Sequence, residues 1–162
     1  MAAPEQYSFR KVSTADLGLL AKWHSQPHVR EWWESSEPST GEELADPRVA
    51  RWIVSYARRP FAYMQDYTVH GWADHHFYQL PKGSRGIDQF IGEPGMTAQG
   101  HGSAFILERL KALFADGAPV VATDPDPKNA RAIAAYKKSG FRIFGPAQDT
   151  PYGRILPMKI SR

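Results

Sequence analysis

The sequence predicts an α/β fold, in which helices cover both faces of a mainly antiparallel sheet. Two strands with period-2 alternation, Arg51–Tyr56 and Phe61–Val69, follow one another across a short turn. Beyond Arg85, strands and helices are expected to alternate. No internal repeat or change of composition divides the 162 residues, so we expect a single domain over residues 1–162.

The N-terminal part is predicted to contain one strand and two helices. Tyr7–Lys11 alternates as a strand does, and a capped amphipathic helix follows it as far as about His24. Pro27 interrupts this helix. A second short helix is expected after a polar loop, with Ser39 or Thr40 as its N-cap.

The C-terminal half is predicted to contain further strands separated by helices. Strands are expected over about Arg85–Ile91 and over the short apolar run Val120–Thr123, and a helix over Ser103–Ala115 separates them. One or two closing strands are expected within Arg142–Phe144 and Arg154–Ile160. This order favours an α/β sheet over a bundle or a sandwich.

The stretch Ala122–Phe141 combines a strand, a rigid turn and a helix. Asp124 ends the strand, and two X-Pro steps force a turn because the residue before proline avoids the helical region. Asn129 can cap a helix that carries Tyr136, with Gly140 as its stop. Ligands collect at the carboxyl ends of strands in such sheets, so this stretch is expected to build a site.

Composition excludes several classes of protein. Without cysteine there is no disulfide, thiol nucleophile or cysteine-bound metal. No apolar run approaches the about 20 residues of a membrane helix, and the N-terminus lacks a signal-peptide core, so we expect a cytoplasmic protein. His75 and His76 are adjacent, and neighbouring strand residues point in opposite directions. No third ligand follows at a suitable spacing, so we expect a loop or substrate contact and no metal.

Charge is divided unevenly along the chain. Residues 127–162 contain eight Lys or Arg and one acid, whereas residues 1–126 contain 12 bases and 16 acids. The basic segment suits nucleic acid or a phosphorylated cofactor. We favour the cofactor, because no arginine-rich run is present. The acidic segment suits a cationic substrate, and for most of the individual charges we expect ordinary solvated surface.

Two further features indicate chemistry, each with a plainer alternative. Asp88 lies within a predicted strand, where aspartate is uncommon. It is either an edge-strand acid paired with Arg85 or, as we favour, a functional acid. Gly95–Gly102 leads into a helix whose first N–H groups can bind phosphate, although a plain turn fits equally well.

These motifs resemble those of the acetyl-CoA-dependent N-acetyltransferases of the GNAT superfamily, and most of all the aminoglycoside 6′-N-acetyltransferases. The strongest pieces are RGIDQFIG (Arg85–Gly92) and TDPDPKNARAIAAYKKSGF (Thr123–Phe141). EWW (Glu31–Trp33) and YMQDY (Tyr63–Tyr67) support them. The resemblance implies a central sheet splayed into a V, with acetyl transfer from acetyl-CoA to a primary amine. That amine would be the 6′-amine of an aminoglycoside, so the role would be antibiotic resistance.

The resemblance also implies which residues bind the cofactor. Five residues would hold the pyrophosphate through backbone N–H groups: Gln99, Gly100, His101, Gly102 and Ser103. Asn129 would contact the cofactor arm, and Tyr136 would protonate the leaving thiolate, which its phenol is suited to do. Thr97 stands where the superfamily has Arg or Gln, so no side-chain phosphate contact is expected there.

Acceptor-binding residues follow from the same resemblance. Asp88 and Asp124 match acids that bind the substrate's amines, and Asp88 would take a proton directly or through a water. Four residues match positions that line the acceptor pocket: Trp32, Trp33, Gln65 and Tyr67. The family usually has an acidic segment before the R-G-I-D strand, whereas Gly71–Ser84 contains one acid, Asp74.

Two rival interpretations remain open. A siderophore-type acyltransferase acting on N-hydroxylated lysine or ornithine shares the strand and helix motifs. It usually has histidine at the position of Asp88, and the segment Asp74–Tyr78 faintly resembles it. A non-catalytic acyl-CoA sensor would need the glycine turn but not Tyr136. For partners we expect a small amine, no nucleic acid and no membrane, with the chain a monomer or a homodimer.

Overall fold

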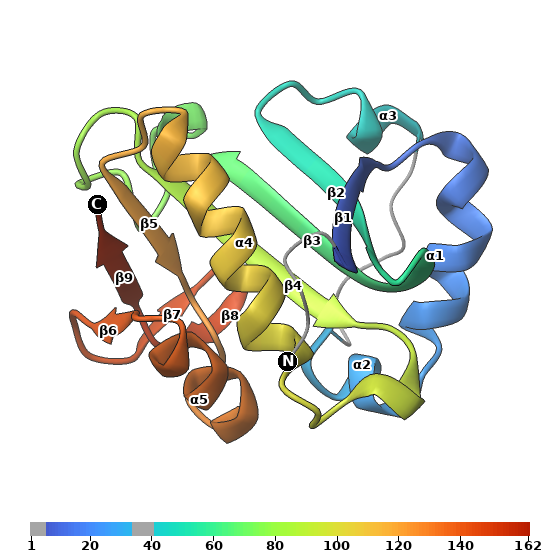
Figure 1. The fold of residues 1–162 in the computed structure, drawn as a ribbon. Coiled ribbons are helices and arrows are strands. Elements are labelled where there is room, and N and C mark those ends of the chain that lie inside the picture. Colours follow the sequence, from blue (N-terminus) through green and yellow to red (C-terminus); the bar gives the residue numbers. More distant parts are fainter. Residues whose placement is uncertain (1–5, 34–40) are drawn as a thin grey trace. The chain divides into compact units, whose positions relative to one another are not determined.

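The computed structural model describes residues 6–33 and 41–162, and the chain divides into two compact units (Figure 1). Unit 1 comprises Met1–Gln65 and Gln89–Gly102, and unit 2 comprises Asp66–Asp88 and Ser103–Arg162. The boundary passes through two strands, β3 (Arg59–Thr68) and β4 (Arg85–Ile91). The expectation of one domain stays a prediction.

Unit 1 contains the N-terminal elements and parts of β3 and β4. Its other elements are β1 (Tyr7–Lys11), η2 (Thr14–Asp16), α1 (Leu17–His24), α2 (Pro27–Trp33), α3 (Gly41–Leu44), β2 (Val49–Tyr56) and η4 (Pro94–Met96). β1 pairs antiparallel with β2, with Tyr7 opposite Tyr56. The predicted first strand and first helix are confirmed.

Two turns in unit 1 differ from the prediction or sharpen it. Pro27 does not terminate the first helix. It is the first residue of α2, where its fixed φ and missing N–H suit a helix start. Ala57 and Arg58 both have positive φ, at 49° and 70°, as the tight turn between antiparallel strands requires. The expected caps Ser39 and Thr40 lie outside the described residues.

The core of unit 1 joins α1 and α2 to the strands. Its buried members are Leu20, Trp23, Val29, Ile53, Tyr63 and Phe90. Gly92 lets the chain after β4 pass against Trp23, because a Cβ there would lie 2.2 Å from the indole ring. Packing of this density fixes the end of β4.

Unit 2 contains the remaining parts of β3 and β4 and the C-terminal elements. These are η3 (Val69–Gly71), α4 (His101–Ala115, from its third residue), β5 (Val120–Thr123), α5 (Ala130–Lys138), β6 (Arg142–Ile143), β7 (Gln148–Thr150), β8 (Gly153–Ile155) and β9 (Met158–Ser161). β4 and β5 run parallel, and β9 pairs antiparallel with both β5 and β6. The bounds predicted for β4 and β5 are confirmed.

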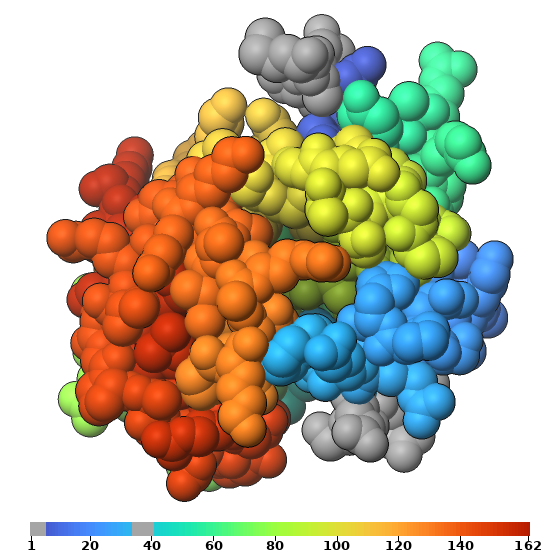
Figure 2. All heavy atoms as spheres, turned by 90° about the horizontal axis from the view of Figure 1, so that it is seen from below, coloured from blue at the N-terminus to red at the C-terminus, as the bar shows by residue number. Residues whose placement is uncertain are grey.

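Helix α5 has the predicted cap and stop. The Asn129 side chain accepts a hydrogen bond from the Ala132 N–H at 3.1 Å, and Gly140 has a φ of 104°. The helix and the turn before it lie at the surface (orange in Figure 2). Four basic residues are exposed there: Lys128, Arg131, Lys137 and Lys138.

The closing segment differs from the prediction of one or two strands. A separate hairpin, β7–β8, stands between β6 and β9, with Thr150 opposite Gly153. Its strands are three residues each, too short to show period-2 alternation.

Helix α4 also begins at His101 rather than Ser103, so the second glycine of the turn lies inside its first turn.

Within the described parts of the chain, the strands form a seven-stranded sheet in the order β1-β2-β3-β4-β5-β9-β6 and the two-stranded sheet β7-β8. Only β4 with β5 is a parallel pair among the registers given above, so the predicted α/β fold with a mainly antiparallel sheet is confirmed. Every helix between residues 6–33 and 41–162 is too short or too polar to cross a membrane.

Candidate functional site

Asp88 and Asp124 lie side by side on the parallel strands of unit 2. β4 pairs with β5 so that Gly86 is opposite Ala122, which brings Asp88 opposite Asp124 two residues further on. Their carboxyl groups hydrogen-bond to each other. We call Asp88 and Asp124 the acid pair; the hydrogen bond between them lowers the pKa of Asp124, against the larger effect of burial.

The edge-strand alternative for Asp88 is wrong. Strand β4 is hydrogen-bonded to β3 on one side and to β5 on the other, so it is not an edge. The guanidinium of Arg85, the suggested partner, binds Asp66. Arg85 and Asp88 are three positions apart in a strand, so they point to opposite faces. Asp88 therefore belongs with Asp124.

His76 contacts Asp124, and the sequence did not predict this contact. Its Nε2 atom is 2.8 Å from Asp124 Oδ2, and the two side chains are 7% and 14% exposed. Burial raises the pKa of Asp124 to about 7, partly opposed by the hydrogen bond with Asp88. Burial lowers the pKa of His76, and the Asp88 charge opposes this. Burial therefore shifts the pKa of each group toward its uncharged form.

Tyr67 contributes a neutral phenol to the same place. Its ring packs on Gly86, where a Cβ would lie 2.2 Å from Tyr67 Cζ. Burial, and next the charges of Asp124 and Asp88, raise the pKa of Tyr67 well above its ordinary value. The hydroxyl therefore stays protonated as a hydrogen-bond donor. We call Tyr67, His76, Asp88 and Asp124 the acid cluster.

Tyr136 and Tyr152 lie within electrostatic reach of this cluster, since both contribute to the raised pKa of Tyr67. Tyr136 is only 4% exposed, and its ring meets Phe141 edge-on at 5.3 Å. The structure thus brings the predicted residues Tyr67, Asp88, Asp124 and Tyr136 together. Asn129 is the N-cap of α5 and lies about two helical turns before Tyr136.

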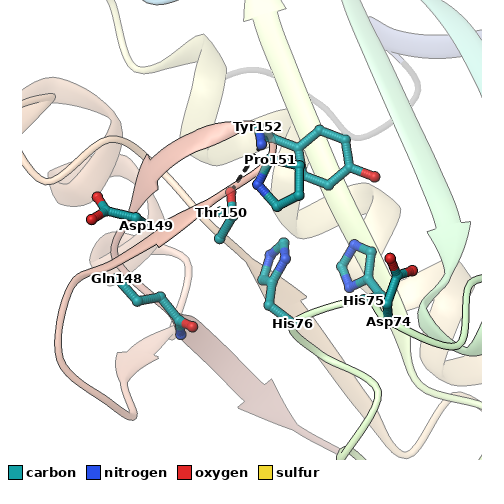
Figure 3. A pocket seen from close by; sticks show the side chains of 8 residues that line it. All are labelled: Asp74, His75, His76, Gln148, Asp149, Thr150, Pro151 and Tyr152. Atoms are coloured by element: carbon teal, nitrogen blue, oxygen red, sulfur yellow. Dashed lines mark hydrogen bonds between the residues drawn. The ribbon is translucent and has the colours of Figure 1, made fainter.

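A pocket of about 300 Å³ lies beside the acid cluster, between the loop after η3 and the β7–β8 hairpin (Figure 3). Its walls are Asp74, His75, His76 and the hairpin residues Gln148, Asp149, Thr150, Pro151 and Tyr152. The His75 and His76 rings stack with centroids 4.2 Å apart, and both residues lie in an irregular loop, as expected. Tyr152 lies 6.2 Å from both rings.

The sequence missed this pocket because its signal is weak. Only the Thr-Pro-Tyr-Gly turn of the hairpin, with Gly153 at a φ of 111°, could have indicated it. No group of three or more His, Asp or Glu side chains in the described ranges is placed to hold a metal ion.

The turn before α4 presents backbone rather than side chains. Gly100 has a φ of 84°, and a Cβ at Gly102 would meet nothing within 4 Å. The Gln99 amide donates to the Gly95 carbonyl at 2.6 Å, and the Ser103 side chain is only 8% exposed. The first N–H groups of a helix lack intrahelical acceptors, so this helix start suits an anion.

The His101 side chain makes other contacts, so it is not placed to bind an anion at this helix start. Its Nδ1 atom is 2.7 Å from the Tyr7 hydroxyl, and its ring lies against Tyr56 at 4.6 Å. Thr97, at the position of the missing Arg or Gln, donates to the Pro94 carbonyl at 3.1 Å. Any anion contact here is consequently a backbone contact.

Three residues expected to line an acceptor pocket belong to unit 1. Trp33 packs edge-on against Phe90 at 5.1 Å, and Trp32 is 37% exposed. The Gln65 side-chain oxygen accepts from the Tyr63 hydroxyl at 2.7 Å and from Arg51 at 3.1 Å. Their acceptor role stays a prediction.

Comparison with known proteins places these features in a family. A model described as an acetyltransferase (GNAT) domain matches residues 13–148. The aminoglycoside N(6′)-acetyltransferase type 1 of Klebsiella pneumoniae is 29% identical over 170 aligned residues, covering 98% of this chain and 84% of that protein. A kanamycin resistance protein of Rhizobium radiobacter is 36% identical over 81 residues, covering 49% of this chain and 74% of that protein.

Solved structures agree with this comparison. The crystal structure of the aminoglycoside acetyltransferase AAC(6')-Ib in complex with coenzyme A and kanamycin superimposes with a TM-score of 0.85. It is 29% identical, and the match covers 96% of this chain and 95% of that one.

Proposed function

Because this chain belongs to the GNAT family of acetyltransferases, we propose that it transfers the acetyl group of acetyl-CoA to the 6′-amine of an aminoglycoside. The observation that carries the proposal is the placement of Asp88 opposite Asp124 on the paired strands β4 and β5, with the Tyr67 ring packed on Gly86 beside them. The similarity to aminoglycoside acetyltransferases over 98% of the chain supports the acceptor class. The function is thus N-acetylation of a small, amine-bearing molecule.

The acid cluster would hold the acceptor amine and take its proton. An ordinary aspartate, with a pKa of about 3.9, is a poor base for an ammonium group with a pKa of about 10. Burial raises the pKa of Asp124 to about 7, which narrows this mismatch. Asp88 would orient the amine nitrogen, and the Tyr67 hydroxyl would donate a hydrogen bond within the cluster.

The cofactor-binding roles rest on the helix start and on α5. Backbone N–H groups of residues 99–103 would bind the pyrophosphate, and the open space at Gly102 fits a close approach. Asn129 would bind the cofactor arm. Acetyl-CoA supplies an activated thioester when bound, and Tyr136 would donate its phenolic proton to the departing sulfur. The exposed basic residues of the α5 region suit the phosphates.

A thiol-release assay with acetyl-CoA and kanamycin tests this proposal. We expect turnover, and NMR of the product should place the acetyl group on the 6′ nitrogen. Asp88→Asn should raise the KM for the aminoglycoside, because the charge that orients the amine is lost. The proposal fails if the purified protein releases no thiol with any aminoglycoside that carries a free 6′-amine.

One observation favours the rival acceptor. His76 supplies an imidazole to Asp124, next to the position of Asp88, where siderophore-type acyltransferases usually have histidine. An N-hydroxylated lysine or ornithine is therefore the second candidate acceptor. Turnover with these compounds, and none with aminoglycosides, would favour it.

A further inference from the structure

His76 lies between the acid pair and the pocket beside the hairpin. Its Nε2 atom contacts Asp124 Oδ2 at 2.8 Å, while the side chain forms part of the pocket wall (Figure 3). With Nε2 on Asp124, Nδ1 is the ring nitrogen through which a second proton can pass. An imidazole so placed connects a buried carboxyl group to a space that solvent can fill.

His75 lines the same pocket but cannot do the same. Burial, and next the nearby His76, lower the pKa of His75 to about 4. His75 therefore stays neutral near pH 7, and the hydrogen bond with Asp124 is made by His76. The two stacked histidines consequently have different chemistry despite their shared position.

The proposed reaction releases one proton that must leave the buried site. An acceptor R–NH₃⁺ first gives one proton to the acid pair and becomes R–NH₂. Its nitrogen then forms the N–C bond as the C–S bond breaks, and the second proton lost from nitrogen balances the one that Tyr136 gives to sulfur. The products are the acetamide, the free thiol and one H⁺, which remains on the acid pair.

We propose that His76 carries this proton from Asp124 to solvent in the pocket, and so resets the acid pair between turnovers. The inference rests on the proposed acetyl transfer to an amine. His76 acts through Asp124 and touches no reacting atom, so it is a positioning residue for that carboxyl group. Its route requires the contact at 2.8 Å and the presence of the same ring in the pocket wall.

Charged and titratable groups surround His76 on every side in unit 2. They are Asp74 and His75 in its own loop, Asp88 in β4, Asp124 after β5, Tyr67 in β3, Tyr136 in α5, and Asp149 and Tyr152 in the hairpin. The charge of Asp88 favours an imidazolium on His76. Asp74 and Asp149 line the pocket, and Asp149 also pairs with Arg154 at 3.0 Å.

The experiment compares His76→Asn and His76→Ala with wild type in the thiol-release assay, with His75→Gln as the matched control. Wild-type turnover first establishes the acetyl transfer, so failure there concerns the proposed function alone. Asn keeps a polar group at the site but takes up no proton, and we expect kcat to fall about 10- to 100-fold. The KM for acetyl-CoA should stay within twofold.

Added imidazole distinguishes proton transfer from a structural role. It should raise kcat of His76→Ala several-fold, with a pH dependence that follows the pKa of imidazole, and should not raise kcat of His75→Gln. His76→Asn, checked by thermal melting, keeps the test valid if the alanine variant folds poorly. Wild-type kcat in His76→Asn, or a folded His76→Ala with low activity that imidazole leaves unchanged, would overturn the proposal.

Discussion

At the scale of single residues, the Asp124 carboxyl group affects both the stability of the fold and the proposed reaction. Its carboxyl group is buried, yet it has hydrogen-bond partners in Asp88 and His76. The sequence indicated both aspartates, because an acid in a strand and an acid after a strand stand out locally. His76 reaches them through a loop of irregular structure, so only the folded chain reveals that contact.

The raised pKa of Asp124 predicts how stability depends on pH. The folded protein binds this proton more tightly than the unfolded chain, whose carboxyl has a pKa of about 3.8. The contribution of Asp124 to the free energy of unfolding is fully present below about pH 4 and is lost as the pH rises through 7. Asp124→Asn should therefore lose less stability between pH 5 and 8 than wild type in urea denaturation. Equal losses would refute the raised pKa.

Removing the Tyr136 hydroxyl is expected to change kcat much more than KM. If its hydroxyl protonates the departing sulfur, Tyr136→Phe should lower kcat about 10²-fold or more while the acceptor KM changes little. The packing of the ring against Phe141 is retained in Phe, so a melting curve close to that of wild type is the control. An unchanged kcat would assign Tyr136 to the core alone.

At the scale of elements, β4 is the strand that builds the site. Its bounds were predicted correctly, as were those of β5, which is a short apolar run. The β7–β8 hairpin was not, since three-residue strands carry no periodic pattern. The pocket beside the acid cluster is thus lined in part by a hairpin that the sequence did not predict.

A methyl group added at Gly86 is expected to disturb the acid cluster. A Cβ at this position would lie 2.2 Å from Tyr67 Cζ, so Gly86→Ala must displace the phenol from Asp88 and Asp124. We expect a loss of kcat/KM for the acceptor together with a lower Tm. Gly18→Ala is the control, because a Cβ there meets nothing within 4 Å and alanine favours the helix. Full activity in Gly86→Ala would contradict this packing.

Asp66 ties β3 and β4 to α4 within unit 2. Its carboxylate is 1% exposed and binds the guanidinium groups of Arg85 and Arg109. Asp66→Asn would leave both cations without their anion, at a cost of about 3 kcal/mol in urea denaturation. The surface pair of Asp46 with Arg48 is the comparison, and Asp46→Asn should leave the midpoint unchanged. Similar midpoints for the two variants would show that Asp66 is dispensable.

At the scale of the whole molecule, the family and the acceptor have different determinants. The family follows from motifs spread over the chain, and the matching domain model covers residues 13–148. We propose that the acceptor depends on the loop over residues 71–84, which contains a single acid, and on the hairpin. Because both segments lack a periodic pattern, their arrangement had to be seen in three dimensions.

The identity of the acceptor is tested most directly by thiol release from acetyl-CoA across three classes of compound. These are aminoglycosides with and without a free 6′-amine, polyamines such as spermidine, and N-hydroxylated lysine and ornithine. We predict the highest kcat/KM for the aminoglycoside with a free 6′-amine and none for its counterpart without that amine. Turnover confined to the hydroxylated lysine or ornithine would contradict the proposed function.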